Sequence, residues 1–305
     1  MKNIMRKLTV TLLCGIGVSV ALTGCQEKAN DYRPEKPIPK IGGYNSANEV
    51  GSGNLVMYLP FNGSTTDSVG NLAGTATETS FGAGIKGQGF EGDPTGYVTY
   101  GSTGATIPVM KNFTVSFWIN AQAPKKDDPA RGIFSLNNNK DFWGNIDIYL
   151  DGYRSLDTMN FKVHINNDAV NWKGQFTNAL VSNAWGKWVH MTAVYNDTTS
   201  VFNIFANGEP IEVSTAGNTT KVGPKLHGDD PAAADVPYGP LKFVNATAMV
   251  VGSWQFQTMP PLTTTASAQG WATGFSGGLD NFRIYNKALN AEEVKSLYLL
   301  EKSGR

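Results

Sequence analysis

The side chains that could recognise a ligand are concentrated in two segments of alternating apolar and polar residues, 145–151 and 159–166. Successive side chains of a β-strand point to opposite faces, so the polar residues of each segment share one face. If the two segments pair as a hairpin, one surface carries Asp147, Tyr149, Lys162 and His164. Carboxylate, phenol, ammonium and imidazole groups can all hydrogen-bond sugar hydroxyls. The alternative is a solvated outer face without a ligand, because antiparallel sheets often leave one face wet.

Two tryptophans flank this surface in polar, loop-like sequence, Trp143 in NKDFWGN and Trp172 in NDAVNWKGQF. An indole face can stack on the C–H face of a sugar ring and bury apolar area there. We therefore expect Trp143 and Trp172 to complete a carbohydrate-binding site, with core packing as the alternative. Trp254 and Trp271 lie in a long Pro-, Thr- and Gly-rich stretch, 221–275, and long loops often carry function. Core packing is expected for the tryptophans in or beside the strongest predicted strands, which are Trp118, Trp185 and Trp188.

The sequence offers no recognisable catalytic constellation. Asp147 and Asp151 would lie about 13 Å apart along a strand, whereas the carboxylates of a retaining glycosidase lie about 5–5.5 Å apart. Metalloprotease, nucleophile-elbow, phosphate-loop and zinc-cluster motifs do not occur. We therefore expect binding without catalysis. A glycosidase or polysaccharide lyase stays open as an alternative, because Tyr149 and His164 would form a Tyr/His pair beside Lys162.

The composition indicates a β-rich globular protein. Charged residues make up 16% of the 305 residues, against about 25% in typical domains, and aromatic residues make up 11%. Disordered chains have the opposite bias. Short, mostly alternating apolar runs separated by turn residues fill residues 53–300 and predict an all-β, two-sheet antiparallel jelly-roll sandwich. Asn290 followed by Glu293 matches a capping box and predicts a short C-terminal helix over 290–300.

The formal net charge of the chain is +0. Nucleic acid therefore has no electrostatic support as a partner, and neither does an anionic membrane surface.

The N-terminus has the pattern of an export signal. Basic residues precede an apolar run over 8–22, which is shorter than the roughly 20 residues that a membrane-spanning helix needs. The run ends in Leu22-Thr23-Gly24-Cys25, which resembles a bacterial lipobox. We expect cleavage before Cys25 and lipid on its sulfur. An ordinary signal peptide followed by a chance cysteine is the alternative.

These features divide the chain into three expected parts. Residues 1–24 are a lipoprotein signal peptide, residues 25–52 are the lipidated cysteine with a flexible Pro- and Gly-rich tether, and residues 53–305 are one domain. The two cysteines, Cys14 and Cys25, leave no disulfide for the mature domain. We expect an outer-membrane lipoprotein of the bacterial cell envelope that contacts the membrane through the lipid on Cys25, with surface exposure left open.

Several stretches are similar to successive strands of a known domain: FTVSFWIN, KWVHMTAVYN, FNIFANGEPI and GGLDNFRIYNKALNAEEV. With the opening LVMYLPFNGSTTDSVGN, they resemble a laminin-G-like jelly roll of the concanavalin A-like lectin/glucanase superfamily, over nearly all of residues 53–300. The resemblance implies two antiparallel sheets, one of them concave. This fold hosts lectins, enzymes and adhesion modules, so it does not by itself assign a function.

The resemblance also implies one structural calcium ion that joins an early loop to the last strand. The matching positions are Asp280 and the loop around Asp67. Calcium takes six to eight oxygen ligands, so backbone carbonyls and water would supply the rest. For Asp280, the alternative is a salt bridge to Arg283 or a turn cap.

Glucanases on this fold carry the strand motif E-x-D-x-x-E. The nearest match begins at Glu91, but Gly96 stands at the position of the last acid and Pro94 would break the strand. We therefore expect a loop there and no glucanase active site.

The sequence thus predicts a cell-envelope lipoprotein that binds carbohydrate, for capture of a polysaccharide or other glycan, without catalysis. A protein-adhesion or structural surface lipoprotein is the main alternative, and an enzyme on the same fold is the third. The identity of the glycan and the oligomeric state are left open.

Overall fold

The computed structural model describes residues 37–152, 157–217, 220–233 and 235–305. The predicted signal peptide and the predicted lipidation site, Cys25, lie outside these residues. Internal contacts divide the chain into Met1–Ile38 and Pro39–Arg305, and the fold below is that of the second unit. Within the described ranges, no helix combines the length and apolar character that crossing a membrane requires.

The first sheet has eight strands in the described part of the chain. Their spatial order is β13 (Glu209–Ile211), β12 (Val201–Ala206), β11 (Trp188–Asn196), β6 (Phe113–Ala121), β18 (Gly277–Tyr285), β4 (Gln88–Gly92) and β3 (Ser80–Ala83). β1 (Leu55–Leu59) pairs with the C-terminal part of β18. Each of these pairs runs antiparallel.

The second sheet has ten strands in the same described ranges. Their order is β15 (Thr220–Lys221), β14 (Val213–Thr215), β10 (Gly174–Ser182), β9 (Thr158–Asn166), β8 (Ile146–Leu150), β7 (Ala130–Leu136), β16 (Met249–Val251), β5 (Tyr97–Tyr100) and β2 (Thr75–Thr77). β17 (Ala272–Gly274) pairs with the start of β7 and runs parallel to it.

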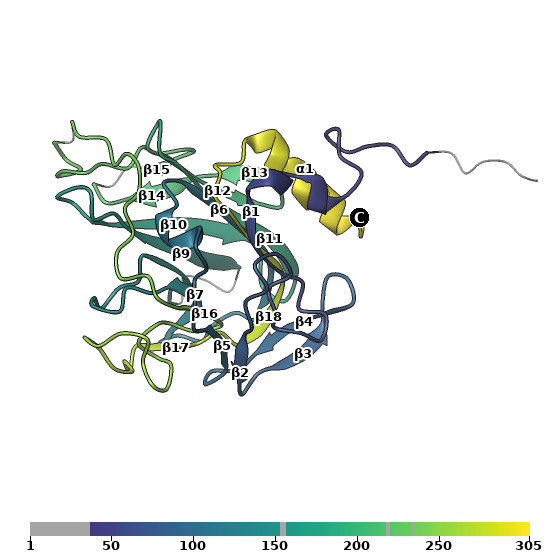
Figure 1. Ribbon diagram of the computed structural model, residues 1–305, viewed down its shortest axis with the longest axis horizontal. Coiled ribbons are helices and arrows are strands. Elements are labelled where there is room, and N and C mark those ends of the chain that lie inside the picture. Colours follow the sequence, from purple (N-terminus) through teal and green to yellow (C-terminus); the bar gives the residue numbers. More distant parts are fainter. Residues whose placement is uncertain (1–36, 153–156, 218–219, 234) are drawn as a thin grey trace, which may run out of the picture. The chain divides into compact units, whose positions relative to one another are not determined.

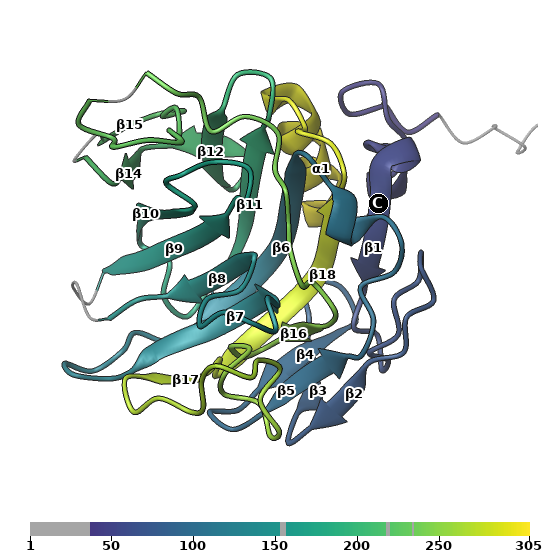
Figure 2. The ribbon, with the colours of Figure 1, turned by 60° about the vertical axis from the view of Figure 1, so that its left-hand side comes forward.

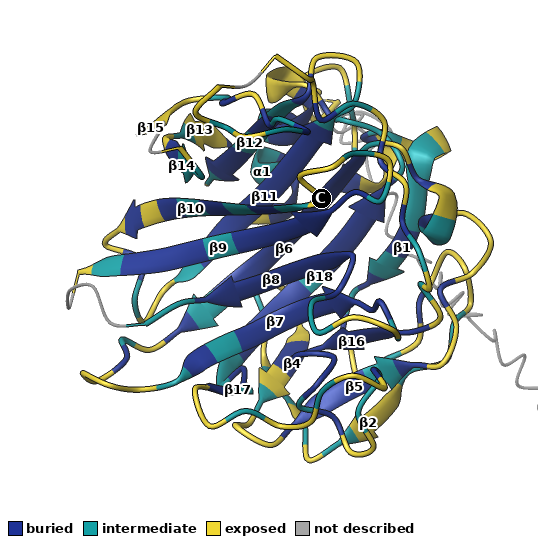
Figure 3. Ribbon diagram, turned by 90° about the vertical axis from the view of Figure 1, so that its left-hand side faces the viewer, coloured by how far each residue is buried: buried dark blue, intermediate teal, exposed yellow. Residues whose placement is uncertain are grey.

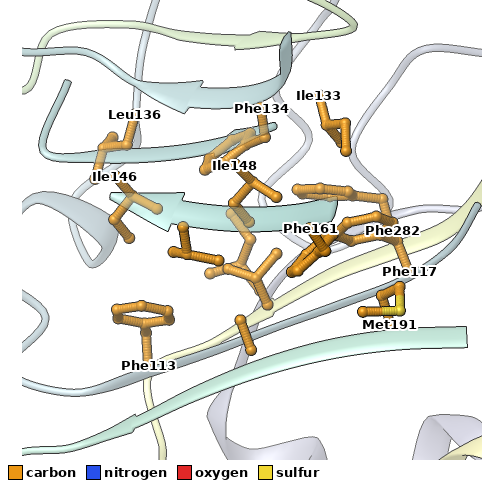
Figure 4. Packing of buried hydrophobic residues seen from close by; sticks show 14 of the residues in the cluster. Phe113, Phe117, Ile133, Phe134, Leu136, Ile146, Ile148, Phe161, Met191 and Phe282 are labelled. Carbon is orange, nitrogen blue, oxygen red and sulfur yellow. The ribbon is translucent and has the colours of Figure 1, made fainter. Parts of the chain in front are cut away.

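The two sheets lie face to face, and the main core fills the space between them (Figure 1, Figure 4). Alternation in the sequence sets which side chains enter this core. Phe117 of β6 and Phe282 of β18 stack with ring centroids 5.5 Å apart, and Phe161 of β9 reaches Phe117 from the opposite sheet. Burial of such a continuous apolar layer is the main force that stabilises a sandwich. The predicted two-sheet antiparallel jelly-roll architecture is confirmed.

The predicted C-terminal helix is α1 (Ala291–Lys302), which packs near the first sheet (Figure 2). The side chain of Asn290 accepts a hydrogen bond from the Glu293 N–H, and the Glu293 side chain accepts one from the Asn290 N–H. This is the capping box that the sequence indicated, and it fixes the first turn of the helix.

Residues 39–52 are part of the folded unit, although the sequence placed them in the flexible tether. Two short 3₁₀ helices lie in or next to this segment, η1 (Ala47–Glu49) and η2 (Ser52–Asn54). A third, η3 (Ile107–Val109), lies later in the chain. Val50 is fully buried in a second apolar cluster with Leu289 and Leu297. The Ala47 N–H also donates to the carbonyl oxygen of Arg305. The boundary lies earlier because short apolar side chains spaced between polar ones find partners on α1, which local composition does not reveal.

Candidate functional site

The hairpin predicted from residues 145–151 and 159–166 is present. β8 and β9 pair antiparallel, with Asp147 opposite His164 and Tyr149 opposite Lys162. The four polar side chains therefore share the face of the sheet that points away from the main core, as the alternation required.

This face is nevertheless covered, and three of the four side chains are buried (Figure 3). Asp147 accepts hydrogen bonds from the Ser135 hydroxyl at 2.6 Å and from the Gly144 N–H at 2.8 Å. His164 Nδ1 lies 3.1 Å from Oδ2 of Asp147, the oxygen that also accepts from the Gly144 N–H. These groups satisfy one another inside the protein, so they hold strands and a turn together and do not face solvent.

The cover is an aromatic cluster formed by Phe142, Trp143, Tyr149, Trp254, Phe256 and Trp271. The ring of Trp143 lies 5.3 Å from that of His164 and 6.0 Å from that of Trp254. Trp254 rests on Gly132, where an added Cβ would come within 2.6 Å of the indole. The part of the Pro-, Thr- and Gly-rich stretch that carries Trp254 and Phe256 thus folds back over the sheet and covers its outer face.

Three of the proposed ligand-binding residues reach the surface. Trp172 is exposed, and Trp143 is partly exposed at the edge of the aromatic cluster. Lys162 is half-buried and forms an ion pair with Asp151 at 3.0 Å. Burial raises the pKa of Tyr149, and the neighbouring Asp151 and Asp147 raise it further. A buried neutral phenol is a poor base, so the Tyr149 and His164 pair does not favour the chemistry of a lyase.

The two carboxylates proposed for calcium serve as acceptors for backbone groups. Asp67 accepts from the N–H groups of Tyr58, Val69 and Gly70. Asp280 accepts from the N–H groups of Ile85 and Asn281.

This use of the two carboxylates leaves few oxygens for a metal. Burial raises the pKa of Asp280 to about 6, although those backbone N–H groups oppose the shift. Within the described ranges, no group of three or more His, Cys, Asp or Glu side chains could hold a metal. The donor set thus fits turn stabilisation better than a calcium site, and calcium stays a prediction.

A cleft that the sequence did not point to lies where the ends of β4, β6, β7, β17 and β18 meet. It has a volume of about 560 Å³, within the range of small-molecule sites. We call it the rim cleft. Its functional side chains are Glu91, Asn120, Gln122, Asp128, Arg131 and Trp188.

The apolar wall of the rim cleft is Trp188, the first residue of β11. The indole packs on Gly278, where a Cβ would lie 2.6 Å from a ring carbon. The neighbouring Gly277 has φ +144° and no room for a side chain against the Asn120 carbonyl. The glycine pair therefore lets the half-buried indole of Trp188 approach the backbone closely.

The polar wall combines a cation with amides and acids. Arg131 donates to the Gln122 carbonyl at 2.9 Å, and its guanidinium lies 5.3 Å from the Trp185 ring centroid. Burial lowers the pKa of Arg131, while Asp128 opposes that shift. The Asn120 amide oxygen is buried and accepts no hydrogen bond from the described residues. The lining of the rim cleft therefore includes both hydrogen-bond donors and acceptors.

Sequence analysis missed this cleft for identifiable reasons. Trp188 was expected in the core, because it opens one of the strongest strands. Glu91 was expected in a loop, yet it lies in β4 because the antiparallel partner Gly278 supplies the ladder. The lining comes from segments separated by up to about two hundred residues. Only the Gly277-Gly278 pair, at the start of β18, could have signalled a close approach.

Comparisons with known proteins agree with the fold. A family model described as the concanavalin A-like lectin/glucanases superfamily matches residues 91–245, half of the chain. A comparison with curated proteins finds no match.

Three solved structures illustrate the likeness. Botulinum neurotoxin type C, whose cell entry is dependent upon interaction with two ganglioside molecules, is 14% identical with a TM-score of 0.52, over 83% of this chain and 52% of that chain. The binding domain of botulinum neurotoxin DC in complex with rat synaptotagmin II is 14% identical with a TM-score of 0.51, over 82% and 52%. Domain 4 of AbnA, a GH43 extracellular arabinanase from Geobacillus stearothermophilus, in complex with arabinotriose, is 16% identical with a TM-score of 0.49, over 80% and 98%.

This chain spans about half the length of the toxin chains, and at these identities the likeness is one of fold. The family match, the two antiparallel sheets and the closing helix lead to one assignment. The chain belongs to the concanavalin A-like lectin/glucanases superfamily.

Proposed function

We propose that the protein is a cell-envelope lipoprotein that binds carbohydrate without catalysis and holds the glycan in the rim cleft. One observation carries the proposal: the cleft places an indole, a guanidinium, amides and carboxylates around about 560 Å³ of space. A sugar presents C–H faces and hydroxyls at the same time, and this combination of groups matches both.

The charges of the lining suit a polyhydroxyl ligand. Glu91 and Asp128 carry negative charges and Arg131 a positive one, so the carboxylates can accept from hydroxyls while the guanidinium donates to them. Each such bond replaces one with water and stabilises the complex by only about 0.5–1.5 kcal/mol. Binding at one cleft is therefore expected to be weak.

The comparisons support this proposal at the level of the superfamily, whose name covers lectins and glucanases. The toxin relative that interacts with gangliosides has the same fold at a TM-score of 0.52. The toxin domain in complex with synaptotagmin supports protein adhesion in the same way, and adhesion is the first alternative.

A glycosidase is a second candidate on one specific observation. Glu91 and Asp128 line the same cleft, as two catalytic carboxylates would. Asp128 already accepts from the Lys125 N–H at 2.7 Å, which favours a loop-holding role. Incubation of the protein with each glycan that it binds, followed by analysis of released sugars, separates the two functions. We expect no release.

A glycan array probed with the full chain tests the proposal. We expect saturable binding to one glycan class, and a loss of about tenfold or more in affinity for Trp188→Ala, because the indole wall is gone. Glu91→Gln, an isosteric change at an exposed position, should weaken binding without affecting folding. Trp172→Ala is the control, since Trp172 is exposed away from the cleft.

Two outcomes contradict the proposal. Loss of binding in Trp172→Ala, with Trp188→Ala unaffected, would move the site to the surface predicted from β8 and β9. A blank array from a folded protein would reject glycan binding and favour adhesion.

A further inference from the structure

We propose that the ligand of the rim cleft is an internal stretch of a polysaccharide that leaves the cleft over Trp271, which acts as a second sugar platform. The inference rests on the proposed function and specifies its ligand: a polymer chain with accessible ring faces, and not a single terminal sugar.

β17 and its neighbour β7 connect the rim cleft with Trp271. Thr273 of β17 lines the rim cleft and pairs in register with Arg131. The carbonyl of Trp271 accepts a hydrogen bond at 2.9 Å from the N–H of Ala130, the residue before Arg131. Two residues of extended chain span about 7 Å, so Trp271 begins within that distance of the cleft wall. The Trp271 indole packs in the aromatic cluster on the outer face of this edge, so a chain that fills the cleft and crosses the edge would meet it.

Trp271 is held in place by neighbouring aromatic rings and is nevertheless exposed. Its ring lies 5.6 Å from those of Trp254 and Phe256, and 6.0 Å from that of Trp143. Despite this support, 43% of Trp271 is exposed. A side chain already fixed by packing loses little conformational freedom when a ligand covers it, so its contact contributes more to affinity than that of a mobile one.

The rim cleft is too small to enclose a polymer. A cleft of about 560 Å³ accommodates a ligand of ordinary drug size, which corresponds to a short oligosaccharide. A polymer therefore exceeds the cleft and must cross its edge. Because Trp271 follows on the strand that forms this edge, it provides a contact for the sugar units that emerge.

The chain contains a closely matched control. Trp172 is 42% exposed, almost the same fraction as Trp271. Trp172 lies just before β10, and its backbone N–H donates a hydrogen bond to the carbonyl oxygen of Gly228. In sheet order, β9 and β8 separate β10 from β7, the strand that β17 joins. Removal of either indole deletes the same amount of exposed aromatic surface, but only Trp271 lies next to the rim cleft.

Calorimetric titration of the full chain with oligosaccharide ladders tests the inference. The probes are β-1,4-glucan, β-1,4-mannan, β-1,4-xylan, α-1,4-glucan and α-1,5-arabinan fragments, each from the monosaccharide to the hexasaccharide. We expect the affinity of the wild type to rise with length in one ladder. Trp271→Ala should weaken binding of the longer members about two- to tenfold and leave the shortest bound member unchanged. Trp271→Tyr should restore part of the loss, and Trp172→Ala should have no effect at any length.

The outcomes distinguish this inference from the proposed function. An affinity independent of length, or an equal effect of Trp271→Ala on short and long members, overturns the polymer path and leaves the cleft as a site for a small sugar. If affinity rises with length and this rise is lost in Trp172→Ala instead, the polymer path lies near β10, away from β17. That result also overturns the inference. Absence of binding to every ladder by the folded wild type rejects the carbohydrate function itself, and the inference with it.

Discussion

Arg283 and Glu301 form an ion pair that is almost completely buried between β18 and α1. Arg283 Nε lies 2.8 Å from one oxygen of Glu301, and Trp118 Nε1 donates to the other at 2.8 Å. Burial lowers the pKa of Arg283, but Glu301 and the neighbouring Tyr285 and Tyr58 outweigh it, so the net shift is upward. The guanidinium therefore stays charged inside the protein. Loss of one partner would leave an uncompensated buried charge, so these residues depend on one another.

His190 lies beside this pair and supplies a pH prediction. Its Nε2 is 3.5 Å from Glu301 and 2.9 Å from the Ser116 hydroxyl. Burial lowers the pKa of His190 from 6.5 to about 3, and the positive charge of Arg283 adds to this. Between pH 6.5 and about pH 3, His190 is therefore protonated in the unfolded chain and neutral in the folded protein. The free energy of unfolding should fall as the pH drops below about 6.5, and this loss should end near pH 3.

The matched variant for this prediction is His190→Gln, which cannot titrate. Between pH 7.5 and pH 4.5, the wild type should lose roughly 3 kcal/mol more stability than the variant, as measured by urea unfolding. The titration of Glu301 is present in both proteins and cancels in the comparison. Parallel pH profiles would show that His190 has the same pKa in the folded and the unfolded protein.

At the scale of elements, local patterns indicated those strands whose two faces differ in polarity. β8, β9 and α1 were predicted from alternation and from the Asn290 capping box. β4 was not, because its glycines and the nearby Pro94 read as a loop, and pairing with β18 and β3 makes it a strand. The fate of the outer face of β8 was equally hidden. Whether this face meets water depends on Trp254, which packs on Tyr149 from more than a hundred residues away in the sequence.

The N-terminal segment gives the prediction that belongs to this scale. Val50 is fully buried between the segment and the residues around α1, whereas Val109 of η3 is 72% exposed. Val50→Ala should lower the free energy of unfolding by about 1–3 kcal/mol, because it removes two packed methyl groups. Val109→Ala is the control and should change it by less than about 0.5 kcal/mol. Equal midpoints in urea for the two variants would restore the boundary expected at residue 53.

At the scale of the whole molecule, weak binding at one cleft and capture of a polymer are compatible. Proteins held on one membrane share a surface, so a polysaccharide can contact many copies at once. Each further contact is then effectively intramolecular, and the combined affinity exceeds that of a single cleft by orders of magnitude. The proposed lipid on Cys25 would provide this arrangement. The anchor and the rim cleft therefore serve one function only when both are present.

The two cysteines of the chain allow a direct test of the anchor. Cys25 ends the predicted lipobox, while Cys14 lies inside the predicted apolar run. In a Gram-negative host supplied with labelled palmitate, the full chain and Cys14→Ser should carry the label and sediment with membranes. Cys25→Ser should carry none, because lipid attachment needs its sulfur.

Purified Cys25→Ser should bind short oligosaccharides like the wild type, while cells that express this variant should retain far less polymer. Membrane association of unlabelled Cys25→Ser would contradict the lipoprotein prediction, and equal polymer retention would show that capture does not depend on the anchor.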